Sequence, residues 1–301
     1  YIVPFGSDVP IEYFVFKTTE NSAYWNSKLP FFEDVIYDRI NAMLSVTILP
    51  TFYSSLLNMD PAWVFKMLFP LIFSLVPLGL YQLWQASVGK KYACISIFLF
   101  MAQVTFYTEV LGLNRQMIAE LFFVLLLLVI LNKKMKPVNK MTFFMIFGFA
   151  LVTSHYALAE IFLFFIFFTF ISLIALKRPS RNITASMVVL FFVVMFTWYI
   201  YTSGSAVFDS FLQFGDYVYT QLADFFNPAS RGREVLRGLG LEESPSVWNT
   251  ISRTFAYLTQ AFIVVGFVGL LTKRAKTRIE RDYFAFSLSA MAFLAALDRK
   301  S

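Results

Sequence analysis

Long apolar runs recur along this chain and are separated by polar connections. Eight such runs cover residues 64–84, 92–108, 115–131, 141–153, 157–176, 183–202, 251–271 and 283–297. A helix needs about 20 predominantly apolar residues to cross a bilayer, whereas barrel strands would show a polar residue at every second position. The pattern therefore predicts an all-α polytopic membrane protein with about eight transmembrane helices or partial spans.

The polar segments suggest two regions. Residues 1–63 are expected to form an acidic loop region on the outer face, and residues 64–301 a transmembrane helical domain with an outer loop over 203–250. Unevenly spaced aromatic residues in that loop indicate short interfacial helices. The polar start without Met and the short final run indicate an excerpt that is truncated at both ends.

Basic residues gather in alternate connections, which predicts the orientation of the spans. The connections that carry them lie at residues 90–91, 133–140, 177–181 and 273–281. Because cytoplasmic loops are enriched in Lys and Arg, these four are expected inside, and residues 1–63, 109–114, 154–156 and 203–250 outside. With 58% hydrophobic and 15% charged residues, the chain is expected in the cell (plasma) membrane. The net charge of +6 is explained by these loops, so no nucleic-acid partner is expected.

Two carboxylates near the start of the chain are the predicted catalytic residues. Asp8 and Glu12 share one face if a helix begins near Pro10, because residues four apart lie on one side of a helix. One could act as a general base while the other orients the substrate or binds a divalent cation, the possible cofactor. The alternative is a solvated acidic loop in which Asp8 is only a helix N-terminal charge.

Polar residues at two outer turns are predicted to bind substrate. The hairpins over 92–131 and 141–176 are so short that their turns must lie at the membrane boundary. Arg115 could bind a lipid phosphate, or only cap its helix. His155, the single histidine, could donate a hydrogen bond to substrate, or only satisfy a local backbone group. The complete predicted set is Arg115, Gln116, Glu120, His155, Tyr156 and, in the long outer loop, Arg231 and Arg233.

Two further observations exclude other chemistry. Cys94 is the only cysteine, so neither a disulfide nor a multi-thiolate metal site can form within the chain. The triplet Asn182-Ile-Thr184 matches a glycosylation acceptor but falls in a predicted cytoplasmic connection, where it should go unused.

Five short strings carry a family resemblance. They lie at residues 6–13, 41–50, 64–70, 115–120 and 154–156, with the sequences GSDVPIEY, NAMLSVTILP, VFKMLFP, RQMIAE and SHY. Together they resemble a mainly archaeal family of membrane proteins defined by domain of unknown function 2206, up to about Leu176. More distantly, the layout resembles the glycosyltransferase C superfamily. That resemblance implies Asp8 as catalytic base, Glu12 as an assisting carboxylate, and a polyprenyl-phosphate-linked sugar donor at the outer leaflet.

The leading functional hypothesis is therefore a membrane glycosyltransferase that acts at the non-cytoplasmic face on a glycan or protein acceptor. One alternative is a glycolipid or polysaccharide transporter or flippase, in which the same charges would line a path. A non-catalytic scaffold in an envelope complex is the other. Polar residues predicted on the outer side only favour the enzyme, since a transporter should show paired repeats and broken helices.

Overall fold

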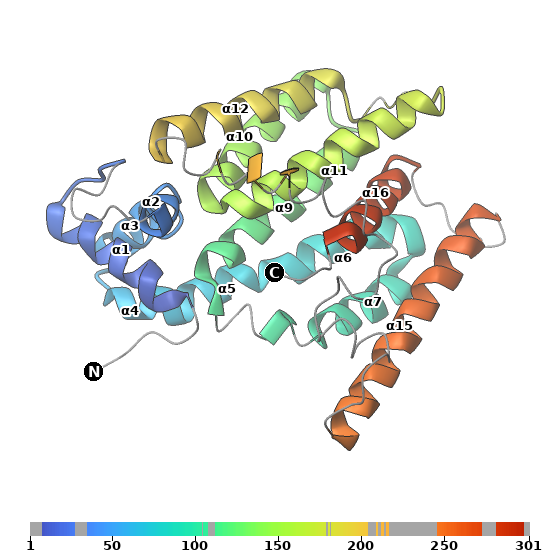
Figure 1. Ribbon diagram of the computed structural model, residues 1–301, viewed down its shortest axis with the longest axis horizontal. Coiled ribbons are helices and arrows are strands. Elements are labelled where there is room, and N and C mark those ends of the chain that lie inside the picture. Colours follow the sequence, from blue (N-terminus) through green and yellow to red (C-terminus); the bar gives the residue numbers. More distant parts are fainter. Residues whose placement is uncertain are drawn as a thin grey trace.

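The computed structural model describes residues 8–27, 35–103, 105–107, 112–178, 180, 182–203, 209, 212–213, 215–216, 246–272 and 281–297. Within these residues all regular secondary structure is helical (Figure 1). The elements are α1 (Val9–Ser22), α2 (Val35–Asn41), α3 (Ile48–Leu57), α4 (Pro61–Trp63), η1 (Val64–Leu68), α5 (Phe69–Phe73), α6 (Leu75–Val88), α7 (Lys90–Met101), α9 (Asn114–Leu131), α10 (Pro137–Ser154), α11 (Tyr156–Ala175), α12 (Ala185–Ser203), α15 (Val247–Leu271) and α16 (Arg281–Leu297).

Six helices of the described chain are long and apolar enough to cross a membrane. They are Pro61–Val88, Asn114–Leu131, Pro137–Ser154, Tyr156–Ala175, Ala185–Thr202 and Val247–Leu270. They match six of the eight predicted spans, with ends that differ by a few residues. The other two predicted spans, 92–108 and 283–297, coincide with the shorter helices α7, of 12 residues, and α16, of 17 residues. Their crossing of the membrane stays a prediction.

The first span, Pro61–Val88, is a helical run that includes one π-helical turn. Pro70 cannot donate the backbone hydrogen bond that an α-helix requires, and the preceding turn, η1, widens to a π-helix in which the Phe69 N–H reaches the Val64 carbonyl. Such π-turns in α-helices concentrate at functional sites. Here the π-helical turn packs against α1: the centroid of the Phe65 ring lies 5.5 Å from that of Tyr13 and 5.6 Å from that of Phe16.

Helix α9 lies at the centre of the bundle, between α5, α6, α10 and α11 (Figure 1). Aromatic rings pack between the helices. The ring centroid of Phe123 of α9 lies 5.4 Å from that of Phe162 of α11, which lies 5.0 Å from that of Phe191 of α12. Large apolar side chains such as Phe98 and Ile146 remain exposed on the outside of the bundle. In a membrane protein that surface faces lipid, so it needs no protein partner.

The helix ends form two polar groups, one at each end of the bundle. We call the first the Arg115 end; it comprises the start of α9, the α10–α11 turn and the last turn of α12. We call the second the Lys140 end; it comprises the end of α6, the α9–α10 and α11–α12 connections and the start of α16. Each end has its own buried charged cluster.

Helices α1 to α3 cover the Arg115 end. The Leu44 N–H donates to the Thr153 carbonyl over 2.7 Å, and the Ser45 hydroxyl donates to the Ser154 carbonyl over 2.9 Å. The Trp198 indole N–H donates to the Ala42 carbonyl over 3.1 Å. Because these bonds use carbonyls that the ends of α10 and α2 leave unpaired, the segment between α2 and α3 completes the helix caps.

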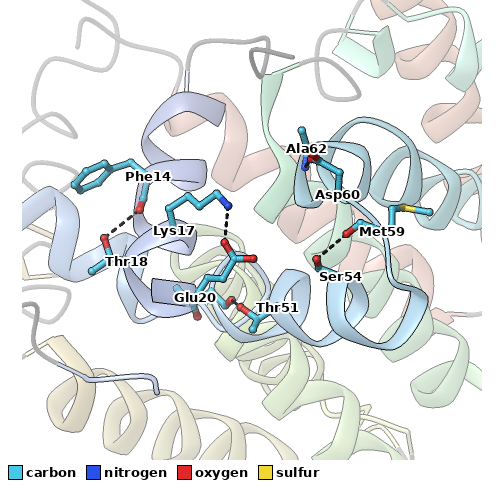
Figure 2. A network of polar contacts seen from close by, with 10 residues as sticks. Phe14, Lys17, Thr18, Glu20, Thr51, Ser54, Met59, Asp60 and Ala62 are labelled. Atoms are coloured by element: carbon cyan, nitrogen blue, oxygen red, sulfur yellow. Dashed lines mark hydrogen bonds and ion pairs between the residues drawn. The ribbon is translucent and has the colours of Figure 1, made fainter. Parts of the chain in front are cut away.

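The outward side of this cover carries a surface polar network (Figure 2). Lys17 pairs with Glu20 one turn later in α1, an exposed pair of the kind that adds little stability. The Asp60 carboxylate accepts from the Ala62 N–H over 2.8 Å and so caps the start of the first span. The Ser54 hydroxyl donates to the Met59 carbonyl over 2.7 Å and closes the turn before it.

The Lys140 end is held by a buried chain of hydrogen bonds. Lys140 Nζ donates to the Ile130 carbonyl over 2.9 Å and to Asn182 Oδ1 over 3.0 Å. Asn182 Nδ2 donates to Asp282 Oδ2 over 2.8 Å, and the same oxygen accepts from the Ser180 hydroxyl over 2.6 Å. Both amide atoms of Asn182 are thus engaged and the residue is buried. That the sequon goes unused stays a prediction.

Candidate functional site

The first turn of α1 positions the two predicted catalytic carboxylates. The helix begins at Val9 with Asp8 as N-cap, and Pro10 lies in the first turn, where its missing N–H costs nothing. The Asp8 carbonyl accepts from the Glu12 N–H over 3.0 Å. Asp8 and Glu12 therefore lie on one helix face, as expected for a helix that begins near Pro10.

The guanidinium of Arg115 lies between these carboxylates. Its Nη1 donates to Glu12 Oε1 over 2.7 Å, and its Nη2 donates to Asp8 Oδ2. The other Glu12 oxygen accepts from the Asn114 N–H over 3.2 Å. Because a helix N-terminus carries partial positive charge, the first turn of α9 offers Glu12 both a full and a partial positive charge.

Burial differs sharply across this trio. The side chain of Glu12 is 0% exposed, that of Arg115 10% and that of Asp8 37%. Burial raises the pKa of the Glu12 carboxyl, and the adjacent Arg115 charge opposes that shift. Asp8 is thus the carboxylate that an external molecule can reach, whereas Glu12 can only act through Arg115.

His155 joins the site from the α10–α11 turn. It is the single residue between the two helices, and its Nδ1 accepts from the Leu158 N–H over 3.2 Å, so it caps α11. Burial lowers the pKa of His155 to about 3, the Arg115 charge lowers it further, and the Asp8 charge opposes both. The neutral ring must then carry its proton on Nε2. His155 thus satisfies a local backbone group through Nδ1, and its role as a donor to substrate stays a prediction.

The predicted residue Tyr156 lies beside this histidine. Its ring stacks on that of His155 with centroids 5.6 Å apart. The same ring packs against the small apolar cluster of Val15, Ile40 and Met43 under α1. Tyr156 therefore connects the α10–α11 turn to the helices that cover it.

Gln116 and Glu120 form a separate pair. The Gln116 amide donates to Glu120 Oε1 over 3.0 Å, as their four-residue spacing predicts. Within the described residues neither side chain hydrogen-bonds to Asp8, Glu12 or Arg115. The structure thus brings Asp8, Glu12, Arg115, His155 and Tyr156 together and leaves this pair apart. Arg231 and Arg233 lie outside the described residues.

A divalent cation has little room at the two carboxylates. Arg115 already bridges Asp8 and Glu12, and among the described residues no group of three or more His, Cys, Asp or Glu side chains could bind a metal ion. Arg115 offsets one of the two carboxylate charges and occupies the space between them, which leaves little room for a cation.

Sequence reasoning missed one charged residue near the site, Arg39 of α2. Its charge acts on the half-buried Glu160 carboxylate of α11, and its Nε is buried without a hydrogen-bond partner among the described residues. The available signal was its isolation: Arg39 is the only basic residue between Lys28 and Lys66.

Comparison with known proteins identifies a family and no relative of known activity. No curated protein and no solved structure matches the chain. The family model matches residues 140–297, whereas the sequence resemblance was expected from the start of the chain to about Leu176. His155 and Tyr156 lie inside the matched stretch, and Asp8, Glu12 and Arg115 lie before it. Since this match covers more than half of the 301 residues, the chain belongs to the family described as Predicted membrane protein (DUF2206).

Proposed function

We propose that this protein is a membrane-embedded glycosyltransferase that uses a polyprenyl-phosphate-linked sugar at the non-cytoplasmic face, with Asp8 as general base. The observation that supports this best is the graded burial of the Asp8–Arg115–Glu12 trio. A reachable carboxylate with fixed orientation suits proton abstraction from an acceptor. A buried partner that holds its neighbour in place suits the supporting role.

The side of the membrane follows from charge. Among the described residues, the connections at the Lys140 end carry Lys90, Lys91, Lys133, Lys134, Lys136, Lys177 and Arg178. The positive-inside rule assigns that end to the cytoplasm. The Arg115 end then faces outward, where a polyprenyl-linked donor would lie in the outer leaflet.

In the proposed reaction Asp8 takes the proton of an acceptor hydroxyl while the acceptor oxygen attacks the anomeric carbon of the sugar. The bond from that carbon to the phosphate oxygen breaks, and polyprenyl phosphate leaves with the bonding electrons. Arg115 orients Asp8, and Glu12 orients Arg115. His155 Nε2–H is available to hydrogen-bond the sugar, and Tyr156 and the Gln116–Glu120 pair complete the proposed substrate contacts.

We do not propose Arg115 as the ligand of the donor phosphate, although the sequence suggested it. Both terminal nitrogens of Arg115 already donate to carboxylates, so its guanidinium is poorly placed to bind phosphate as a bidentate fork. Arg231 and Arg233 remain the proposed phosphate ligands of the outer loop.

Substitution of Asp8 by Asn tests the proposal. Asn keeps the size of the side chain but cannot accept the proton, so sugar transfer should fall by roughly 10²–10⁴-fold in full-length protein reconstituted with polyprenyl-phosphate sugars. Asp60→Asn is the matched control, because Asn caps a helix as well as Asp and the Asp60 carboxylate accepts from the Ala62 N–H instead of from Arg115.

Three results would contradict the assignment. Transfer by Asp8→Asn at the parental rate would exclude Asp8 as the base. Transfer only when the donor is presented on the side of Lys134 would reverse the orientation. If no donor is consumed but a labelled glycolipid crosses the vesicle membrane, the transporter hypothesis replaces the enzyme. The half-buried carboxylates Glu120 and Glu160, which lie inside two candidate spans, then become candidates for lining its transport path.

A further inference from the structure

Helix α3 exposes an apolar face although it lies outside the candidate spans. Ile48, Phe52 and Leu56 follow one another at four-residue intervals, so they project from one side of the helix. They are 41%, 56% and 65% exposed. The chain carries no charged residue between Arg39 and Asp60. Because a row of large apolar side chains is unfavourable in water, this face indicates an apolar partner.

The other two sides of α3 have a different environment. Leu49 and Tyr53 are half-buried and pack against the hydrophobic core of the bundle. Thr51 and Ser54 lie on the side that carries the surface polar network (Figure 2), where the Thr51 hydroxyl donates to the Thr47 carbonyl over 2.9 Å. The exposed apolar face is therefore a third side of the helix, separate from the core contact and from the polar surface.

The length of the first span sets the depth of α3 in the membrane. Pro61–Val88 has 28 residues, which extend for about 42 Å, whereas the hydrocarbon core is about 30 Å thick. A typical tilt of about 20° shortens the span by only about 3 Å. Because the basic residues Lys90 and Lys91 follow directly, its last turn belongs at the boundary of the Lys140 end. Its first turns then reach the head groups, and α3 packs against η1 within those turns.

The beginning of α3 lies at the membrane boundary as well. Leu44 and Ser45 donate hydrogen bonds to the carbonyls of Thr153 and Ser154, which end the candidate span Pro137–Ser154. Helix α3 begins three residues after Ser45 and ends just before the first span. It therefore joins the ends of two spans, and with 10 residues it is too short to cross the bilayer itself.

The surface next to α3 already faces lipid. Trp63, Met67 and Leu71 of the first span also follow at four-residue intervals, and all three are exposed. The turn that Asp60 caps joins this span to α3, and both lie at the same end of the bundle (Figure 1). Trp is enriched at membrane interfaces. The lipid that covers this row is therefore available to the apolar face of α3.

We propose that α3 is an interfacial helix that inserts Ile48, Phe52 and Leu56 into the head-group boundary of the leaflet at the Arg115 end. The partner is the lipid surface itself, and because α3 has no charge, apolar burial instead of attraction to anionic head groups holds it there. Since α1 packs on α3, this contact keeps the cover that carries Asp8 at the level of the head groups. The inference concerns membrane contact alone and stands whether or not the protein transfers sugar.

Depth-dependent fluorescence quenching tests the proposal in the full chain. Cys94, the only cysteine, is replaced by Ser, and Leu56→Cys is labelled with an environment-sensitive fluorophore in nanodiscs of dioleoyl phosphatidylcholine, where water reaches both faces. Nitroxide placed near the head groups should quench this probe about twofold more strongly than nitroxide near the chain ends, because an interfacial helix buries its apolar face by about 5–10 Å. Iodide in the water should quench it weakly.

Three further variants calibrate the measurement. Leu71→Cys, at a residue as exposed as Leu56, reports the lipid face of the first span and should be quenched by lipid nitroxides and spared by iodide. Ser22→Cys, at the exposed last turn of α1, should be quenched by iodide alone. Phe52→Cys repeats the measurement on the same face of α3, so the test does not depend on the folding of one variant.

Three results would overturn the interfacial position. Iodide quenching of the α3 probes equal to that of Ser22→Cys, without an effect of lipid nitroxides, would mean that the face lies in water. Strongest quenching by the deep nitroxide would place α3 inside the hydrocarbon. Protection from both quenchers would mean that protein covers the face, and loss of this protection in discs that hold one chain would identify a second copy as the cover.

Discussion

The two ends of the bundle both bury charged side chains, but they arrange them differently. At the Arg115 end a guanidinium contacts two carboxylates directly, and one of them, Asp8, is 37% exposed. At the Lys140 end the amide of Asn182 separates Lys140 from Asp282, and all three side chains are buried.

This contrast separates a reactive arrangement from a structural one. The network at the Lys140 end joins the starts of α10 and α16 to the α11–α12 connection, so it fixes helix positions, and its Lys140, Asn182 and Asp282 side chains are buried. The trio at the Arg115 end has the same rigidity in its buried half, but it presents one oriented carboxylate to the outside. Buried polar groups in proteins must be paired in either case, so exposure of one member is the informative feature.

The largest effect on stability is expected from Arg115→Met. The substitution leaves the fully buried Glu12 carboxylate without its ion pair, which typically costs about 3–5 kcal/mol. Thermal or denaturant unfolding in detergent should show the loss. Adding Glu12→Met should restore most of the stability, because an apolar pair replaces the lone charge. If the single variant is as stable as the parent, the buried pair does not hold α1 to α9.

Lys140→Met sharpens the comparison, because the two acceptors of the Lys140 hydrogen bonds are a carbonyl and an amide oxygen, which are neutral. The Ile130 carbonyl and the Asn182 amide oxygen lose a donor, and unpaired neutral acceptors cost about 1–3 kcal/mol. The same unfolding assay should therefore rank Lys140→Met below Arg115→Met, while any activity of Asp8 should persist. A larger loss for Lys140→Met would mean that the Lys140 end carries the greater share of stability.

Over a single pH unit, the smallest of the three expected effects is a pH dependence due to His155. Its pKa of about 3 in the fold lies below the ordinary value of about 6.5, so between these values the unfolded chain binds more protons. Stability from this group is present above about pH 6.5 and is lost as the pH falls toward 3, by at most about 1.4 kcal/mol per pH unit.

His155→Gln should flatten that part of the unfolding profile. Glu12 acts in the opposite sense, since burial raises its pKa and acidification then favours the fold. The difference between parent and His155→Gln isolates the histidine, and identical slopes would show that His155 is not kept neutral by its surroundings.

Several parts of this fold could be predicted from local sequence alone. Hydropathy placed six spans within a few residues of their observed ends, because the free energy of burial in lipid sums over consecutive residues. The one-residue turn at His155 follows from the shortness of its hairpin. The helix start at Asp8 follows from Pro10.

Long-range pairing could not be predicted in this way. The sequence suggested that Arg115 binds a phosphate, but the structure pairs it with Asp8 and Glu12, which lie more than 100 residues earlier. Arg39, near Glu160, carried no motif. Which polar groups meet depends on the crossing angles of the helices and on their rotation about their own axes. Neither quantity can be read from a short stretch of sequence.

The sequence by itself determined that this protein is a helical membrane protein and where its polar turns lie, since hydropathy and turn chemistry act over a few neighbouring residues. Only the tertiary structure decided which charge meets which. Packing of Tyr13 and Phe16 of α1 on Phe65 of the first span brings Glu12 to Arg115. The physical reason is that a helix may rotate about its own axis without any change in its local interactions, so contacts with its neighbours alone select the face that it buries.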